Sequence, residues 1–206
     1  MSSTAQRAPA RSTNVQSAIV LSTLVLLMAA TRVNHFAPVP DASWAVFFIG
    51  GFYLRSWTRW AFPLLMALAV AVDYFVISGQ GINFWQHYCV SAAYWCLVPA
   101  YFAMWAGGAW LQRHAQGPAV RKLGLAAAAL LASVAVCHLI SQGSFYWTSP
   151  VVAAPTVAGW WKNYSDWFVP YLSTAAMYVG IAVVVHAIVV QAARASRGQS
   201  GTLRPH

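Results

Sequence analysis

The sequence predicts an all-α integral membrane protein with six transmembrane helices. Of its 206 residues, 60% are hydrophobic and only 7% are charged, whereas about a quarter of the residues of a typical soluble domain are charged. The apolar residues form successive runs, and several approach the roughly 20 residues that a helix needs to cross a hydrocarbon core. Short polar segments separate the runs, as expected for a bundle of membrane helices.

The six predicted spans cover residues 15–31, 42–54, 60–78, 86–111, 123–141 and 167–193. The first span is followed by a second one rather than by a cleavage site and a soluble domain, so it is not a signal peptide. The second span is short and is interrupted by Gly50 and Gly51, so we expect it to tilt, to lie behind its neighbours or to begin earlier. Residues 15–193 form one membrane domain, and we expect the polar segments 1–14 and 194–206 to be flexible.

The formal net charge of +9 does not indicate a nucleic-acid binder, because the positions of the basic residues follow the order of the predicted spans. With the N-terminus in the cytoplasm, ten basic residues fall on the cytoplasmic side, and only Arg32 and Lys162 lie outside. The positive-inside rule therefore predicts that both termini are cytoplasmic. The cytoplasmic basic residues are Arg7, Arg11, Arg55, Arg59, Arg113, Arg121, Lys122, Arg194, Arg197 and Arg204.

The outer connections are then residues 32–41, 79–85 and 142–166. The last of these is long and rich in aromatic residues, which predicts a lid over a concave site rather than a simple turn. Its aromatic residues include Tyr146, Trp147, Trp160, Trp161 and Tyr164.

Ionisable residues near the predicted outer surface are candidates for ligand contacts because such groups are costly inside a membrane. Asp73 lies near the outer end of the third span and is expected either to contact a ligand or to hydrogen-bond to a neighbouring helix. Arg32 and His35 follow the first span and are expected to meet a ligand from above, unless Arg32 only extends to the membrane interface.

The cysteines Cys89, Cys96 and Cys137 have no spacing typical of a zinc site. Cys96 and Cys137 are interpreted as packing residues. Cys89 is predicted in the first turn of the fourth span, where free N–H groups favour a thiolate. A single soft thiolate suits a metal that a macrocycle already holds, whereas the alternative is a buried, inert thiol. His87 is a second candidate ligand, on another face of the predicted helix.

Three passages resemble the BtuM family of solitary cobalamin transporters, which are related to the substrate-binding S-components of energy-coupling factor (ECF) transporters. The passages are RVNHFAPVPDASWAVFFIGGFYLR, NFWQHYCVSAAYWCLVPAYFAMWAGG and GSFYWTS. The resemblance implies an S-component-like bundle in the bacterial inner membrane that binds and imports cobalamin or a related corrinoid. It also implies that Cys89 is the axial cobalt ligand.

On this interpretation, cobalamin and the lipid bilayer are the expected partners. The first span, AIVLSTLVLLMAA, lacks the small-residue motif with which related proteins dock an energising module. We also hypothesise that Cys89 acts catalytically by helping to remove an upper ligand such as cyanide. Candidate corrinoid-binding residues are Arg32, Asn34, His35, Asp73, Asn83, Tyr88, Tyr94, Phe145, Tyr146 and Trp147.

Two alternatives remain open. A haem-bearing or quinone-reactive oxidoreductase would use His87, His138 or His186, and a subunit that binds a metal-free vitamin would leave Cys89 without a role. The sequence contains no P-loop pattern, so any ATP hydrolysis would occur on another chain.

Overall fold

The structure is a computed structural model that describes residues 8–33 and 39–202, with side chains in 14–33 and 39–196. The described residues form helices and connecting loops and contain no strand, so the all-α prediction is confirmed. The elements are α1 Ala8–Arg32, α2 Ser43–Tyr53, η1 Arg55–Trp57, α3 Thr58–Gly79, η2 Phe84–Gln86, α4 Ala92–Trp95, α5 Leu97–His114, α6 Ala119–Thr148 and α7 Val157–Thr202.

Four stretches of the described chain are helical, long and apolar enough to cross a membrane, which indicates a membrane protein. They are Asn14–Arg32, Arg55–Gly79, Ala119–Thr148 and Val157–Ser196. Helix α2 has 11 residues and measures about 16 Å at 1.5 Å per residue, so it is too short to cross the core by itself. Four of the six predicted spans are thus supported by length and composition.

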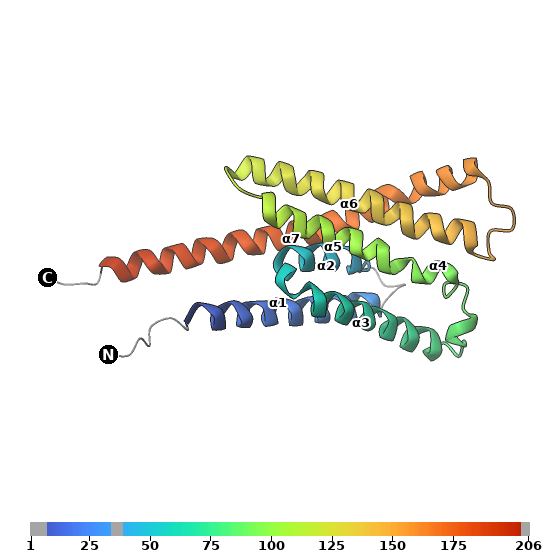
Figure 1. The fold of residues 1–206 in the computed structure, drawn as a ribbon, viewed down its shortest axis with the longest axis horizontal. Coiled ribbons are helices and arrows are strands. Elements are labelled where there is room, and N and C mark those ends of the chain that lie inside the picture. Colours follow the sequence, from blue (N-terminus) through green and yellow to red (C-terminus); the bar gives the residue numbers. More distant parts are fainter. Residues whose placement is uncertain (1–7, 34–38, 203–206) are drawn as a thin grey trace.

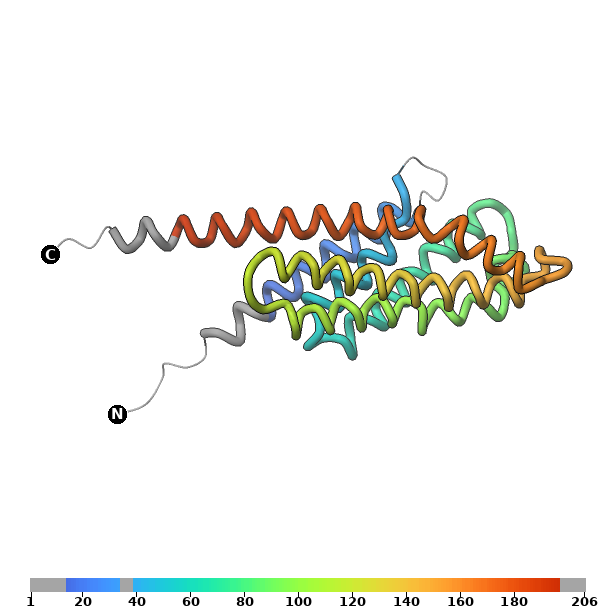
Figure 2. Tube along the Cα trace, turned by 90° about the horizontal axis from the view of Figure 1, so that it is seen from above, coloured from blue at the N-terminus to red at the C-terminus, as the bar shows by residue number. Residues whose placement is uncertain are grey.

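The helices lie side by side, and α1 begins at the same end of the bundle at which α7 ends (Figure 1). Seen from above, α7 extends well past the beginning of α6 at that end (Figure 2). Basic residues also gather there, because α3 and α6 begin and α5 ends at this end. We call it the basic end, defined by Arg55, Arg59, Arg113, Arg121, Lys122 and Arg194.

Helix α2 lies in the core, and its glycines are packing sites rather than an interruption. The helix runs unbroken through Gly50 and Gly51. A Cβ atom at Gly51 would collide with the carbonyl oxygen of Trp105 on α5, and one at Gly108 would collide with the carbonyl oxygen of Phe48. The two helices therefore approach closely only because these positions carry no side chain.

The predicted fourth span, 86–111, is divided differently in the structure. The chain from Phe84 to Ser91 forms η2 and turns, and regular helix begins at Ala92. A second break falls at Cys96, between α4 and α5. Pro99 lies one turn after this break and has no N–H to bond to the Trp95 carbonyl, which explains why a regular helix is interrupted here.

The predicted lid at residues 142–166 is wrong, because most of this segment is helical. Helix α6 continues to Thr148 and α7 begins at Val157, which leaves a connection of residues 149–156. The Thr156 hydroxyl oxygen accepts a hydrogen bond from the Gly159 N–H at 3.1 Å and caps the start of α7. Trp147, Trp160 and Trp161 therefore belong to helices.

Candidate functional site

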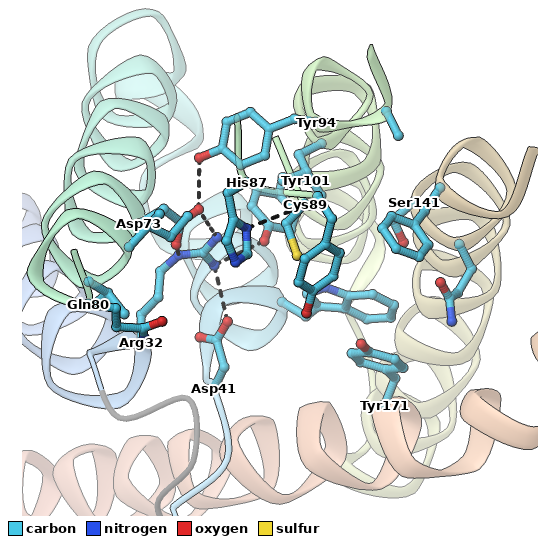
Figure 3. A pocket seen from close by; sticks show the side chains of 18 residues that line it. Arg32, Asp41, Asp73, Gln80, His87, Cys89, Tyr94, Tyr101, Ser141 and Tyr171 are labelled. Carbon is cyan, nitrogen blue, oxygen red and sulfur yellow. Dashed lines mark hydrogen bonds and ion pairs between the residues drawn. The ribbon is translucent and has the colours of Figure 1, made fainter. Parts of the chain in front are cut away.

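A cavity of about 350 Å³ opens at the end of the bundle opposite the basic end, and we call this end the pocket end. It lies among the helices α1 to α7 and the connection between α3 and α4 (Figure 3). The side chains that line it are those of Arg32, Asp41, Trp44, Asp73, Val76, Ile77, Gln80, His87, Tyr88, Cys89, Ala93, Tyr94, Leu97, Tyr101, Ser141, Gln142, Phe145 and Tyr171.

One wall of the cavity is a buried ion pair between α1 and α3. Arg32 Nε donates to Asp73 Oδ1 and Arg32 Nη2 donates to Asp73 Oδ2, each at 2.7 Å. This two-pronged geometry is the strong form of an arginine–carboxylate contact. The side chains are only 6% and 8% exposed, so the pair compensates two charges that would otherwise be unpaired inside the bundle.

The third guanidinium nitrogen of Arg32, Nη1, is also engaged. It donates to Asp41 Oδ2 at 3.1 Å, to the Ser43 hydroxyl at 3.0 Å and to the Tyr101 hydroxyl at 3.2 Å. The Tyr94 hydroxyl donates to Asp73 Oδ2 at 2.7 Å. The network therefore joins α1, α2, α3, α4 and α5, and its polar groups mainly satisfy one another.

Asp41 and Tyr101 are members of this network that sequence reasoning missed. Asp41 Oδ1 accepts hydrogen bonds from both the backbone N–H and the hydroxyl of Ser43, so Asp41 also fixes the start of α2. An acidic residue two positions before a helix of apolar residues is a recognisable capping signal. Nothing in the local sequence around Tyr101 marks it as a partner of Arg32.

Cys89 lines the cavity, but it lies in a turn and not in the first turn of a helix. The next helix begins at Ala92, and the Ser91 hydroxyl caps it by accepting from the Ala93 N–H at 3.3 Å. Burial raises the pKa of the Cys89 thiol, a hydrogen bond from Tyr88 lowers it, and the nearby Asp73 carboxylate raises it. The free thiol thus keeps its proton more firmly than an exposed one, contrary to the predicted stabilised thiolate.

His87 also lines the cavity and contacts Cys89 through the backbone. Its Nδ1 accepts a hydrogen bond from the Cys89 N–H at 3.3 Å, so neutral His87 carries its proton on Nε2. The prediction that residues 87 and 89 lie on different faces of a helix is wrong, because this segment is not helical. Both side chains line one cavity (Figure 3).

Only some of the predicted corrinoid-binding residues line the cavity. Tyr88, Tyr94 and Phe145 line the cavity. Asn83 instead caps η2 by accepting from the Trp85 N–H at 3.0 Å. Three further outcomes concern the remaining candidates: the Tyr146 hydroxyl accepts from the Thr156 N–H, Trp147 is exposed outside the cavity, and Asn34 and His35 lie outside the described residues.

The opposite wall is built from two aromatic residues that the sequence did not single out. Trp44 of α2 and Tyr171 of α7 stack with ring centroids 4.6 Å apart and an angle of 14° between the ring planes. His138 packs against both rings, is fully buried, and its Nε2 donates to the Tyr164 carbonyl oxygen at 2.9 Å. His138 therefore supports the wall and does not line the cavity.

The histidines considered for an oxidoreductase lie in three separate environments. His87 lines the cavity, His138 is buried behind Trp44, and His186 hydrogen-bonds through Nδ1 to the Tyr53 hydroxyl at 2.8 Å, nearer the basic end. Within the described ranges, no group of three or more His, Cys, Asp or Glu side chains is arranged to hold a metal ion. The cavity presents one thiol and one imidazole.

Fold and cavity together define an all-α membrane protein with a thiol-bearing pocket at one end, one wall of which is a buried ion pair. No protein-family model matches the chain, and no curated protein matches it.

Proposed function

We propose that the protein is a membrane transporter that binds and imports cobalamin or a related corrinoid in the cavity at the pocket end. The observation that carries the proposal is the position of Cys89, which lines this cavity together with His87 and aromatic side chains. The similarity of the segment around Cys89 to the BtuM cysteine motif adds a second, independent argument. Under this proposal six helices form an S-component-like bundle.

Among the side chains that the structure describes, the cavity offers only one thiol and one imidazole as soft or borderline metal ligands. This small number suits a metal ion that is already bound in a macrocycle when it reaches the cavity. A bare ion needs several protein ligands, whereas corrin nitrogens already fill the equatorial positions of cobalt, so the protein needs to supply only one axial donor. A thiolate is a soft donor suited to this position. Cys89 is the proposed axial ligand, and Tyr88 and Phe145 are the proposed apolar contacts of the corrin face.

The size of the cavity determines how a corrinoid would lie. About 350 Å³ is at the small end of the 300–1,000 Å³ typical of small-molecule pockets, and a corrinoid with its amide side chains exceeds it. We therefore propose that the corrin lies across the mouth, with the cobalt facing Cys89. Arg32 and Asp73 act beneath it as positioning residues, because their hydrogen-bonding groups are already engaged.

Cys89 would also take part in ligand exchange at cobalt. When cyanocobalamin binds, the cobalt–carbon bond to cyanide would break and a cobalt–sulfur bond would form. Cyanide would leave with its electron pair and take up the thiol proton as hydrogen cyanide, so the oxidation state of cobalt would not change. Because the pKa of the Cys89 thiol is raised by burial, loss of the proton is a required step at neutral pH.

The uneven distribution of basic residues supports an orientation for transport. The basic end is proposed to lie in the cytoplasm of a bacterial cell by the positive-inside rule, which directs the pocket end outward in the inner membrane. An ECF-type energising module stays a possible partner under this proposal. Restored growth of a cobalamin auxotroph that lacks its own importer tests transport directly, and failure despite good expression counts against it.

The spectral test compares Cys89→Ser with wild-type protein and with Cys96→Ser as the matched control. Cys96 is a partly buried thiol on the same segment that does not line the cavity. We expect wild type and Cys96→Ser to shift the absorption spectrum of cyanocobalamin on binding, and Cys89→Ser to leave it unchanged. An identical shift in all three proteins would refute ligation by Cys89.

A smaller, metal-free vitamin is the second candidate, because a cavity of about 350 Å³ would enclose such a molecule completely. The chromophore that co-purifies from cells supplied with corrinoid separates the two candidates. A flavin spectrum, or no chromophore together with tight binding of a small vitamin, would favour the second.

A further inference from the structure

A second cavity, of about 450 Å³, lies at the opposite half of the bundle and has no role in corrinoid binding. It is a groove among α2, the end of α5, the first half of α6 and the middle of α7. Its inner part is lined by apolar side chains, including Phe48, Ile49 and Val179. Phe48 and Ile49 are buried core residues, so the groove reaches the core of the bundle.

Small side chains keep this groove open. The helices α6 and α7 border the groove, and each contributes two alanines to its lining: Ala119, Ala126, Ala182 and Ala187. Helices α6 and α7 also diverge toward the basic end (Figure 1). Because four of the positions that α6 and α7 contribute to the lining are alanines, the widening space is only partly filled, and the groove opens to the side of the bundle.

The polar groups of the groove gather at its outer part. Helix α2 runs toward the basic end, so its Tyr53 lies nearer that end than Phe48. Helix α7 runs in the same sense, which brings His186 nearer the basic end than Val179, and α6 contributes Lys122 close to its start. The Tyr53 hydroxyl and His186 Nδ1 are 2.8 Å apart. The groove is therefore amphipathic along its length, with an apolar inner part and a basic, hydrogen-bonding outer part.

No acidic side chain of the protein is placed to neutralise this outer part. The chain contains three acidic residues, and all pair with cations in the other half of the bundle. Asp41 and Asp73 pair with Arg32, and Asp166 pairs with Lys162. Lys122, which is exposed at this part of the groove, therefore has no acidic side chain of the protein as a partner and is available to an anion from the surroundings.

We propose that this groove binds an anionic phospholipid, with an acyl chain in the apolar inner part and the phosphate beside Lys122, Tyr53 and His186. Charge complementarity and the polarity gradient match this ligand. A partner helix matches less well, because 450 Å³ equals only about one turn of a helix roughly 10 Å wide. A Lys or Arg near an anionic membrane surface typically contributes a several-fold gain in affinity.

The test is native mass spectrometry of the full chain in detergent with added phosphatidylglycerol or phosphatidylcholine. We expect wild type to retain phosphatidylglycerol preferentially, and Lys122→Gln to weaken retention about five-fold. Arg59→Gln removes a cation at the same end but outside the groove, and it should retain the lipid as wild type does. Equal retention of the two lipids by wild type, or equal losses in both variants, would overturn the proposal.

A second pair of variants tests the position of the acyl chain. Ala126→Phe fills the groove and should weaken retention about ten-fold, whereas Ala127→Phe places the same ring on the exposed face of α6 and should have no effect. Ala182→Leu narrows the groove from α7 and replaces the first variant if that one does not fold. Unchanged retention in a folded groove variant would overturn the proposal.

Two further measurements separate the lipid from other occupants. Soluble glycerol phosphate carries the headgroup charge without an acyl chain, and we expect it not to displace phosphatidylglycerol. Displacement would mean that the site binds phosphate alone. A wild-type dimer that Ala126→Phe converts to a monomer, without selective lipid retention, would instead assign the groove to a second copy of the chain and contradict the proposal.

Discussion

The two ends of the bundle handle charge in opposite ways. At the pocket end, Arg32 is buried and its donors reach Asp73, Asp41 and two hydroxyl groups. At the basic end, neither the arginines nor Lys122 pair with an acidic side chain, because the three acidic residues pair elsewhere. Charge buried at the pocket end is compensated within the chain, whereas charge at the basic end is left for the surroundings.

The largest effect on stability is expected when the central cation of the pocket end is removed. Arg32→Ala leaves Asp73 buried without its partner, and breaking a buried pair in this way typically costs about 3–5 kcal/mol. Arg59→Ala at the basic end removes an exposed arginine and should change stability by less than about 1 kcal/mol. Thermal unfolding of the two variants in detergent measures the difference.

A double variant shows whether the loss comes from the uncompensated charge. Arg32→Met combined with Asp73→Leu removes both charges and should recover much of the stability lost in Arg32→Ala, because apolar replacement of a buried pair is often close to neutral. Equal instability of the single and double variants would mean that packing of the arginine side chain, and not charge compensation, is what matters.

A matched pair of tyrosines provides the next test. Tyr94→Phe removes a hydrogen bond to the buried Asp73 carboxylate, and such bonds to charged groups contribute about 1.5–3 kcal/mol. Tyr53→Phe removes a hydroxyl that contacts His186 at an exposed position, so we expect a loss below about 1 kcal/mol. Similar losses in both variants would remove the distinction between the two ends.

The smallest predicted effect is a pH dependence confined to the pocket end. Because burial raises the pKa of the Cys89 thiol, its rate of alkylation should rise about ten-fold per pH unit until the pH reaches that raised pKa. Tyr88→Phe removes the hydrogen bond that lowers this pKa, so the profile should move to higher pH. Iodoacetamide labelling in a Cys96→Ser background measures both profiles. A labelling rate that stays constant between about pH 7 and about pH 9 would contradict the raised pKa.

The helices were predictable from the sequence because apolar runs of sufficient length leave few alternatives in a membrane. The run at 60–78 corresponds to α3, Thr58–Gly79, with an error of two residues or fewer at each end. The lid prediction failed because the aromatic residues of 142–166 were interpreted as parts of one long loop, although they belong to α6 and α7. The capping residue Thr156 was the local signal that α7 begins early.

The site was predictable only where residue chemistry is unusual. Cys89, Arg32 and Asp73 were found because a thiol or a charge is rare in apolar sequence, and all three line one cavity. Trp44 and Tyr171 were missed because the chain contains many aromatic residues, and only tertiary packing determines which two of them stack. Cys89 lies in a turn because Ser91 caps a helix that begins only at Ala92. This capping residue was not recognised as a helix start because it stands in a largely apolar run.

The one-sided distribution of basic residues also makes the molecule sensitive to the membrane potential. Each elementary charge carried across a membrane at 100 mV changes the energy by about 2.3 kcal/mol. Turning the bundle over would carry the whole basic end across that potential, whereas the paired charges of the pocket end largely cancel. A voltage applied across the vesicle membrane during reconstitution should therefore bias the direction in which the protein inserts, with the basic end on the negative side.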